Sequence, residues 1–320
     1  MTEVERGVQA LRAGGLVVLP TETVYGLAAD AVNPQAVARV YAVKGRPADH
    51  PLILHLADSA RLETWAATVP EYVHNLAAAL WPGPLTMVLP RTDRVADYVT
   101  GGQDTVAIRV PDHPLAQAVL TEFGGGVVAP SANRFGHVSP TTAAHAEQDL
   151  GDRLVAGLDI VIDGGPCQVG VESTILDCTG EYPVVLRPGT LGVVHIEQAA
   201  GVPVSRESAR PIRVPGSLTS HYAPQAQVQI VSDAADLMPD TSVPPRVGLL
   251  ALAEVTTPPG VVRLAAPSEA GDYARVLYAA LREADSLQLQ QVVALAPAGD
   301  DGAAVAVRDR LQRAAADRPS

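Results

Sequence analysis

Residues 16–26 read LVVLPTETVYG, and this stretch points to the fold class. Its four consecutive apolar residues, 16–19, predict a short strand that is buried on both faces of a sheet. Directly after them come the hydroxyls of Thr21, Thr23 and Tyr25 and the carboxylate of Glu22. Ligands of open α/β sheets bind where strands end. The stretch therefore predicts an α/β protein with a ligand site here, with a polar turn and capping hydroxyls as the alternative interpretation.

The segments on either side alternate between helical and strand patterns. Apolar residues recur at helical spacing within 4–11, and Asn33 followed by Pro34 predicts a helix that runs to Lys44. Further strands are predicted at 52–56, 85–89, 106–110, 127–129, 160–162, 174–176 and 184–186. Further helices are predicted at 59–67, 71–80, 114–121 and 141–150. This order predicts a mixed α/β sheet covered by helices.

The composition along the chain predicts two domains joined by a linker. At about 150 residues per domain, 320 residues suggest two. We assign residues 1–204 to the first domain and 205–227, rich in Pro, Ser and Arg, to a linker that is either a tether or a lid. Residues 228–320 form a smaller α/β domain, with strands predicted at 228–231, 247–252 and 291–295 and helices at 273–284 and 303–315.

Composition excludes several classes of protein. The net charge is −12 and aromatic residues are only 4%, which argues against a protein that coats nucleic acid. The two cysteines, Cys167 and Cys178, lack the CxxC spacing of a zinc site and fit a reducing compartment. No apolar run reaches the length of a membrane span, and the first residues are a charged helix. We expect a cytoplasmic protein with no membrane partner and no protein-held metal.

Two motifs offer cations to an anionic ligand. Lys44 is the single lysine beside 22 arginines, and with Arg46 it flanks a glycine turn suited to phosphate or carboxylate. Alternatively, Lys44 is only a charge at a helix C-terminus. The alternation of residues 105–110 puts Thr105 and Arg109 on one face of a strand. Arg109 then needs an anionic partner, either a ligand or an internal Asp or Glu.

Small polar groups stand at other predicted strand ends. The segment 129–133, APSAN, and Ser139 after it could approach phosphates or a ribose, although the same residues also make ordinary turns. Ser173 and Arg187 hold similar positions, whereas His55 lies within an apolar run typical of a core histidine. Common nucleotide, metalloprotease and nucleophile motifs are absent, so covalent catalysis has no strong candidate.

Taken in order, these motifs resemble the YrdC family of threonylcarbamoyl-AMP synthases. The resemblance rests on PTETVYGLA (20–28), KGRP (44–47), HPLILHL (50–56), WPGPLTMVL (81–89), TVAIRVP (105–111), APSAN (129–133), VESTILD (171–177) and LRPG (186–189). HYAP (221–224), YAALREAD (278–285) and AVRDRLQRAA (306–315) are similar to the long form of the family. The resemblance implies a YrdC-like twisted mixed sheet covered by helices, a linker, and a smaller Rossmann-like α/β domain.

The resemblance also implies the reaction and its partners. Members of the family convert ATP, L-threonine and bicarbonate into threonylcarbamoyl-adenylate and pyrophosphate, the first step of threonylcarbamoyladenosine modification at position 37 of tRNA. It implies Mg²⁺ bound with ATP, a downstream tRNA threonylcarbamoyl transferase complex, and tRNA itself as a weak partner. The alternative is a YrdC-like RNA-binding module without catalysis, which the negative charge disfavours. A hydrogenase-maturation relative is set aside because its cysteine pairs are missing.

By the same resemblance, each motif receives a role. Lys44 and Arg46 are the predicted catalytic residues. The predicted L-threonine contacts are Thr23, His55, Arg109, Ala129 and Ser173. The predicted ATP contacts are Arg46, His50, Thr105, Ser131, Asn133, Ser139, Arg187 and Tyr222, the last as a lid contact on the linker. The linker departs from the family pattern at 217–220, where basic residues are missing, and Arg206, Arg210 and Arg213 are the candidate replacements.

Overall fold

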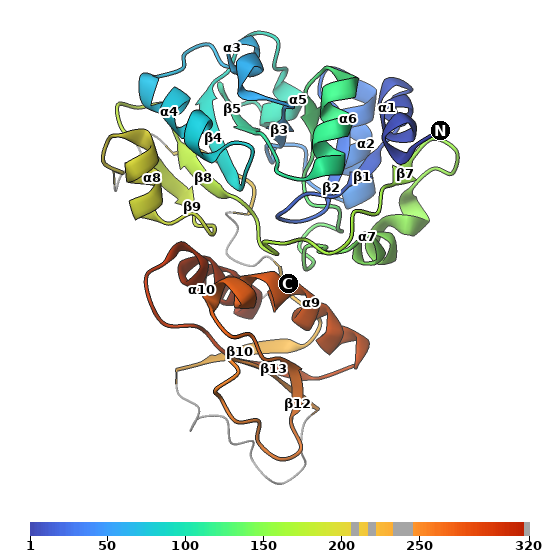
Figure 1. Cartoon of the computed structure of the whole chain (residues 1–320). Helices are drawn as coiled ribbons and strands as arrows, with labels where there is room; N and C mark the ends of the chain where they lie inside the picture. The colour runs from blue at the N-terminus through green and yellow to red at the C-terminus, as the bar shows by residue number, and fades with distance from the viewer. Residues whose placement is uncertain (206–210, 217–221, 233–245, 317–320) are drawn as a thin grey trace.

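The residues that the structure describes form two sheets, one in each predicted domain (Figure 1). This is a computed structural model, and it describes residues 1–205, 211–216, 222–232 and 246–316. Arg206, Arg210 and residues 217–220 therefore lie outside the described residues. The larger sheet has nine strands from residues 17–187, and the smaller has four from residues 227–295. Within the described ranges, no helix has the length and apolar character that a membrane span requires.

The elements follow the predicted order with four additions. The described helices are α1 (Glu3–Arg12), α2 (Pro34–Lys44), α3 (Leu62–Trp65), α4 (Glu71–Leu80), α5 (Asp97–Thr100), α6 (Pro114–Phe123), α7 (Ala143–Leu150), α8 (Val193–Ala200), α9 (Ala270–Ser286) and α10 (Gly302–Ala315), with 3-10 turns η1 (Ser59–Arg61) and η2 (Gly151–Arg153). The strands are β1 (Val17–Leu19), β2 (Gly26–Asp30), β3 (Ile53–His55), β4 (Leu85–Pro90), β5 (Thr105–Arg109), β6 (Val127–Val128), β7 (Ile160–Val161), β8 (Thr174–Asp177), β9 (Val184–Arg187), β10 (Gln227–Val231), β11 (Val247–Leu250), β12 (Val262–Ala265) and β13 (Gln291–Leu295). The sequence does not predict β2, α5, α8 or β12.

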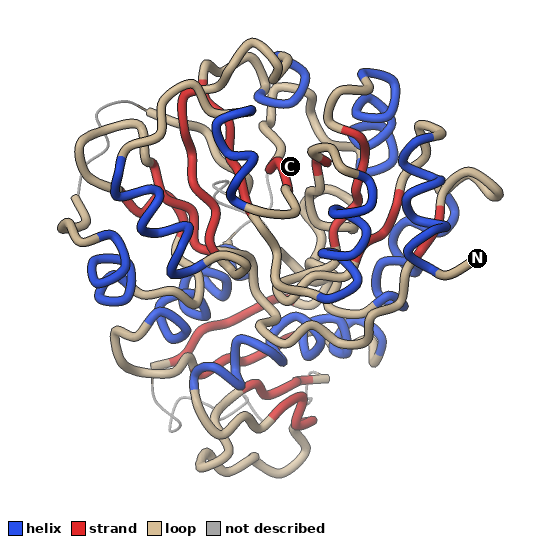
Figure 2. The backbone as a smooth tube through the Cα atoms, turned by 45° about the horizontal axis from the view of Figure 1, so that its top comes forward, coloured by secondary structure: helices blue, strands red, loops and turns tan. Residues whose placement is uncertain are grey.

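The large sheet is mixed, as expected, with the strand order β7-β1-β2-β6-β3-β5-β4-β8-β9. β1 pairs antiparallel with β2 and parallel with β7. Val17 and Leu19 pack with α1 and α6 on one face, whereas Val18 packs with α2 on the other. Figure 2 shows helices along the strands of this sheet. Burial on both faces explains why the first strand is a continuous apolar run.

The small domain has four parallel strands in the order β10-β13-β11-β12. α9 and α10 pack together against one face of this sheet, where they share an apolar cluster with Val228, Leu250 and Val292. In Figure 1 both helices lie between the small sheet and the first domain. The C-terminal domain therefore meets the first domain through its helices.

β5 confirms the alternation read from the sequence. Val106, Ile108 and Val110 belong to the main core under the helices. Ala107 faces the other way, into a small cluster with Ile53, Ile175 and Val214. Val214 and the partly buried Ile212 belong to the predicted linker, so these two residues pack over this face of the sheet, and Arg109 lies on the same side.

Candidate active site

The loop between β1 and β2 is held in shape by its own threonine side chains. Thr21 Oγ1 donates to the Val24 carbonyl at 2.6 Å and lies 2.9 Å from Thr23 Oγ1. Gly26, at the start of β2, approaches the next segment so closely that a Cβ there would lie 3.1 Å from Ala129 Cβ. These local bonds place Thr23 and Val24 at the wall of a pocket.

Arg109 lies at the end of β5 and makes the internal ion pair that the sequence left open. Its Nη2 is 2.5 Å from Glu22 Oε1, and only 5% and 6% of the two side chains is exposed. Nη1 donates to Thr23 Oγ1 at 2.7 Å, and Nε donates to the Gly83 carbonyl at 3.2 Å. A guanidinium has five N–H groups, so three contacts leave donors for a ligand. Arg109 both ties the loop to the sheet and lines the pocket.

His55 lies beside Arg109 because β3 and β5 pair in register at these residues. Its Nδ1 is 3.1 Å from the Ile53 carbonyl. A carbonyl only accepts, so Nδ1 carries the proton and Nε2 is an acceptor. Burial, and then the positive charge of Arg109, lower the pKa of His55 to about 3. The imidazole is therefore neutral near pH 7 and offers a hydrogen-bond acceptor in the pocket.

Two further guanidinium groups converge on the same pocket. Arg46 follows Gly45, whose φ of 64° makes the sharp turn that ends α2. Arg46 Nη2 donates to the Pro51 carbonyl at 2.8 Å, while its buried Nε has no hydrogen-bond partner among the described residues. Burial lowers the pKa of Arg46 to about 10, so it stays charged at neutral pH. Arg187, at the end of β9, donates to the carbonyls of Ser173 and Pro215.

Glu172 is a carboxylate in the pocket wall. Ser139 donates to its Oε1 at 2.7 Å, and Tyr278 of α9 donates to its Oε2 at 2.8 Å. Arg310 of α10 donates to the same Oε2 at 2.8 Å. Burial alone would raise the pKa of Glu172, but Arg310 and Arg187 lower it to about 2. Glu172 is therefore charged at neutral pH and is held mainly from the C-terminal domain.

Together these groups line a small pocket with a cavity volume of about 50 Å³. Nine predicted site residues lie in its wall: Thr23, Arg46, His55, Arg109, Ala129, Ser131, Ser173, Arg187 and Tyr222. The pocket extends over the covered face of β3 and β5, beyond the strand ends that the sequence indicates. With three arginines against one glutamate, the wall is cationic although the whole chain is acidic. This local charge favours an anionic ligand.

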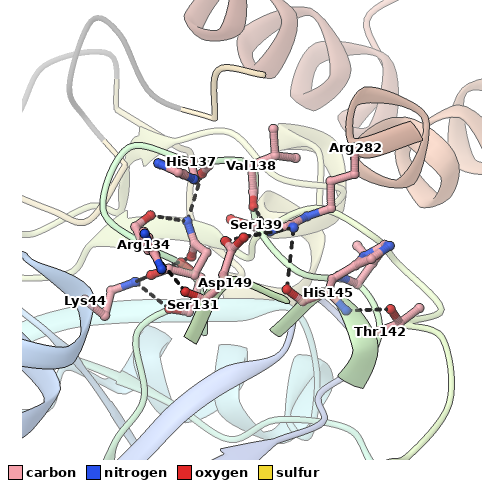
Figure 3. A network of polar contacts seen from close by, with 12 residues as sticks. Lys44, Ser131, Arg134, His137, Val138, Ser139, Thr142, His145, Asp149 and Arg282 are labelled. Carbon is pink, nitrogen blue, oxygen red and sulfur yellow. Dashed lines mark hydrogen bonds and ion pairs between the residues drawn. The ribbon is translucent and has the colours of Figure 1, made fainter. Parts of the chain in front are cut away.

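Lys44 does not line the pocket, and its ammonium is occupied by backbone. Its Nζ donates to the carbonyls of Ser131 and Asn133, each at 2.6 Å (Figure 3). Burial, and then the nearby charge of Arg46, lower the pKa of Lys44 well below its usual value. The structure therefore places Lys44 behind the APSAN segment, and its hydrogen bonds stabilise the conformation of that segment.

Four other predicted residues also lie outside the pocket wall. His50 packs edge-on against Phe135, with ring centres 5.3 Å apart. Thr105 is buried at the start of β5. Asn133 Nδ2 donates to two carbonyls of its own loop, and Ser139 donates to Glu172. Direct roles for these residues in binding stay predictions.

The structure adds residues that the sequence did not assign. Val24, Ile53, Pro130, Glu172, Pro215 and Gly216 complete the wall. Glu172 is visible in the sequence as a polar residue beside Ser173, but nothing local to it indicates its partners. Arg213, a candidate replacement for the missing linker cations, donates to the Gly101 carbonyl at 2.8 Å. It does not line the pocket.

Comparison with known proteins decides the family. The model of the Sua5, YciO and YrdC family, described as telomere recombination, matches residues 9–189. A second model, described as the C-terminal domain of threonylcarbamoyl-AMP synthase, matches residues 191–316. The chain belongs to the Sua5–YrdC family of threonylcarbamoyl-AMP synthases.

Relatives in this family match both domains. The threonylcarbamoyl-AMP synthase of Bacillus subtilis is 38% identical over 99% of this chain and 94% of its own length. The Pyrococcus abyssi enzyme of the same name is 44% identical over 71% of this chain and 67% of its own length. The crystal structure of P. abyssi Sua5 complexed with L-threonine superposes with a TM-score of 0.86, at 36% identity over 98% of this chain and 94% of that one. The family resemblance and the two-domain α/β fold are confirmed.

Proposed function

We propose that this chain synthesises threonylcarbamoyl-AMP from L-threonine, bicarbonate and ATP, as its family does. The reaction is the first step of threonylcarbamoyladenosine modification of tRNA. The observation that carries the proposal is the cationic pocket, in which Arg46, Arg109 and Arg187 converge beside small hydroxyls. ATP and the carboxylate of threonine are both anionic, and the pocket supplies charge and hydrogen bonds to each.

The threonine subsite of this proposal lies at the Arg109 side of the pocket. Arg109 pairs with the threonine carboxylate through the N–H groups that its internal contacts leave over. Thr23, Ala129 and Ser173 surround the amino acid. His55, neutral at pH 7 with a free acceptor at Nε2, receives a hydrogen bond from the amino acid.

The nucleotide subsite lies at the Arg46 and Arg187 side. Arg46, whose buried Nε has no partner among the residues that the structure describes, faces the triphosphate, and Arg187 adds a second fixed charge. Ser131 and Tyr222 complete this side, while Asn133 and Lys44 hold the APSAN segment from behind. We keep as proposed contacts of ATP the side chains of His50, Thr105 and Ser139. They reach ATP only if the pocket closes around the bound nucleotide. A lid over this side excludes water from the reactive anhydride.

The chemistry requires orientation and charge rather than a nucleophile on the protein. The threonine amine and CO₂ from bicarbonate form a carbamate and release a proton. A carbamate oxygen then attacks the α-phosphorus of ATP, the bond to the β-phosphate bridging oxygen breaks, and pyrophosphate leaves. Fixed guanidinium groups stabilise the charge that moves onto pyrophosphate. Cys167 is buried, and burial raises its thiol pKa to about 12, which suits a structural residue.

Magnesium remains part of the proposal as a companion of ATP. Across the described ranges, no group of three or more His, Cys, Asp or Glu side chains is placed to hold a metal ion. The carboxylate of Glu172 is already bonded to Ser139, Tyr278 and Arg310. We therefore assign the ion to the phosphate oxygens of its ATP chelate.

The product determines the proposed partners. Threonylcarbamoyl-AMP is a mixed anhydride that hydrolyses in water, so it must pass quickly to an enzyme that transfers its acyl group. We assign that step to a tRNA threonylcarbamoyl transferase complex, in the cytoplasm where tRNA is modified. The net charge of −12 allows at most weak direct binding of tRNA.

Pyrophosphate release tests the proposed function. Each of ATP, L-threonine and bicarbonate is left out in turn, and L-serine replaces L-threonine in a further sample. We expect release only with all three substrates, and a lower rate with serine, which lacks the methyl group of threonine. Threonine-independent release, or none from folded protein, would overturn the proposal.

A further inference from the structure

The C-terminal domain reaches the pocket through two buried side chains. Tyr278 and Arg310 are each 0% exposed, and both bond to the same oxygen, Oε2 of Glu172, at 2.8 Å. They come from α9 and α10, which lie 106 and 138 residues beyond Glu172 in the chain. Glu172 itself lines the pocket. One carboxylate in the wall of the nucleotide side is therefore held by the other domain.

Tyr222 joins the same cluster from the linker. It is 1% exposed, its φ is +62°, and its ring lies 5.5 Å from that of Tyr278. The guanidinium of Arg310 lies over the Tyr222 ring at 5.4 Å, within the range of a cation–π interaction. A side chain at Gly216 would collide with the Tyr222 hydroxyl, so the linker packs closely around it. Arg310 thus touches both Glu172 and the predicted lid residue.

The charges explain why this arrangement matters for ATP. Glu172 lies near Arg187, whose positive charge lowers its pKa, and both side chains line the pocket. Without Arg310, the charge of Glu172 would be compensated mainly by Arg187, and less positive charge would remain for the triphosphate. Arg310 and Tyr278 both donate to Oε2 and so compensate the charge of Glu172 themselves. A buried ion pair contributes little net stability, but removing one partner leaves the other charge buried and unpaired.

Other contacts between the domains anchor this placement. Arg282 of α9 forms an ion pair with Asp149 at 2.9 Å, and it also donates to the carbonyl of Val138 (Figure 3). Asp285 accepts hydrogen bonds from the backbone N–H groups of Gln225 and Ala226, just after Tyr222. The end of the linker is thereby fixed to α9.

We infer that Arg310 and Tyr278 are positioning residues for ATP. They compensate the charge of Glu172, which leaves Arg187 available to the triphosphate, and they pack against Tyr222 in the pocket wall. Nucleotide binding therefore depends on the docked C-terminal domain. The inference rests on the proposed function, because it assigns this side of the pocket to ATP. It predicts a selective effect. The KM for ATP depends on the cluster, whereas the KM for L-threonine, bound beside Arg109, does not.

The first test replaces Arg310 with Met in the full-length chain. Methionine keeps an apolar stem and removes the charge. We expect the KM for ATP in pyrophosphate release to rise about tenfold or more, since a hydrogen-bonded charge is lost, and the KM for L-threonine to stay within about twofold. Arg310→Lys should recover part of the loss. The matched control is Arg308→Met on the same helix, because Arg308 contacts only Pro297 and Asp300 of its own domain among the contacts described.

A double variant tests whether Arg310 acts through Glu172. Adding Glu172→Gln to Arg310→Met removes the stranded carboxylate, so it should lower the KM for ATP relative to Arg310→Met alone. A purely structural role for Arg310 would give no such recovery. Equal rises in the KM values for ATP and threonine, or an unchanged KM for ATP, would overturn the inference.

Tyr278→Phe keeps the test decisive if Arg310→Met does not fold. It removes one hydroxyl and keeps the ring. Its control is Tyr273→Phe, also 0% exposed on α9, whose hydroxyl donates to the Leu250 carbonyl within the C-terminal domain. We expect only Tyr278→Phe to raise the KM for ATP, and equal KM values in the two variants would refute the inference. Absence of threonine-dependent release from the unaltered chain would instead refute the proposed function.

Discussion

Replacing Arg109 separates its structural role from its role toward threonine. The Arg109–Glu22 pair is almost fully buried, with 5% and 6% of the side chains exposed. Arg109→Met leaves Glu22 charged and without its cation, which costs about 3–5 kcal/mol. For a domain of about 200 residues, each kcal/mol lowers the Tm by about 2–4 °C, so we expect a fall of about 6–20 °C. Urea denaturation and a thermal melt measure both quantities.

A second substitution in the same protein isolates the ligand contact. Arg109→Met with Glu22→Gln carries no stranded charge, so it should recover about half or more of the lost stability. The KM for L-threonine should nevertheless stay raised by about tenfold or more, because the guanidinium that pairs with the threonine carboxylate is still missing. Recovery of a normal KM in the double variant would show that Arg109 only braces the loop. A loss below about 1 kcal/mol in the single variant would refute the account of the buried pair.

Three further predictions follow from the site. Arg46→Ala should abolish most turnover and lower the Tm slightly, because the Pro51 carbonyl loses its donor. Lys44→Ala should lower both turnover and Tm, and the Tm by more, because two loop carbonyls lose their donor. A turnover equal to that of the unaltered protein in either variant would contradict the assignment. The pKa of His55 is about 3 in the folded protein against an ordinary value of 6.5, so the unfolded state binds the extra proton and stability falls as pH drops from about 6.5 toward 3. His55→Asn should flatten that fall by up to about 1.4 kcal/mol per pH unit in urea titrations between pH 4 and 6.5, and an unchanged slope would refute the neutral buried imidazole. Deleting residues 205–320 should leave a folded first domain, as judged by circular dichroism. Its pyrophosphate release should be greatly weakened, because Glu172 loses both of its C-terminal partners. Full activity would mean that the linker is only a tether and that the second domain takes no part in catalysis.

Local patterns in the sequence predict many of the helices and strands. They fail where a strand forms because of its hydrogen-bonding partners in the sheet rather than because of its own side chains. The strand 17–19 and the alternation of 105–109 are readable because burial imposes an apolar run in one and a period of two in the other. β2, GLAAD, is not readable because glycine and alanine have little preference for strands. It forms because β1 and β6 supply hydrogen-bonding partners on its two sides.

The residues of the candidate site also fall into two groups, those that a local motif identifies and those whose role depends on partners far away in the chain. Nine residues assigned by motif lie in the pocket wall, since each motif brings a polar side chain close to one region of the sheet. Lys44 differs: its position as the single lysine suggested a phosphate contact, but its ammonium is taken up by two carbonyls that lie 87 and 89 residues away in the chain. Nothing near Lys44 in the sequence indicates those acceptors.

By itself, the sequence determined the α/β class, the order of most helices and strands, and the family, because these depend on local periodicity and on motifs in series. The tertiary structure decided which charge meets which. Arg109 meets Glu22 across 87 residues, and Arg310 meets Glu172 across 138. Ion pairs form through space, and separation along the chain carries no information about them until the sheet and the two helices of the second domain have packed.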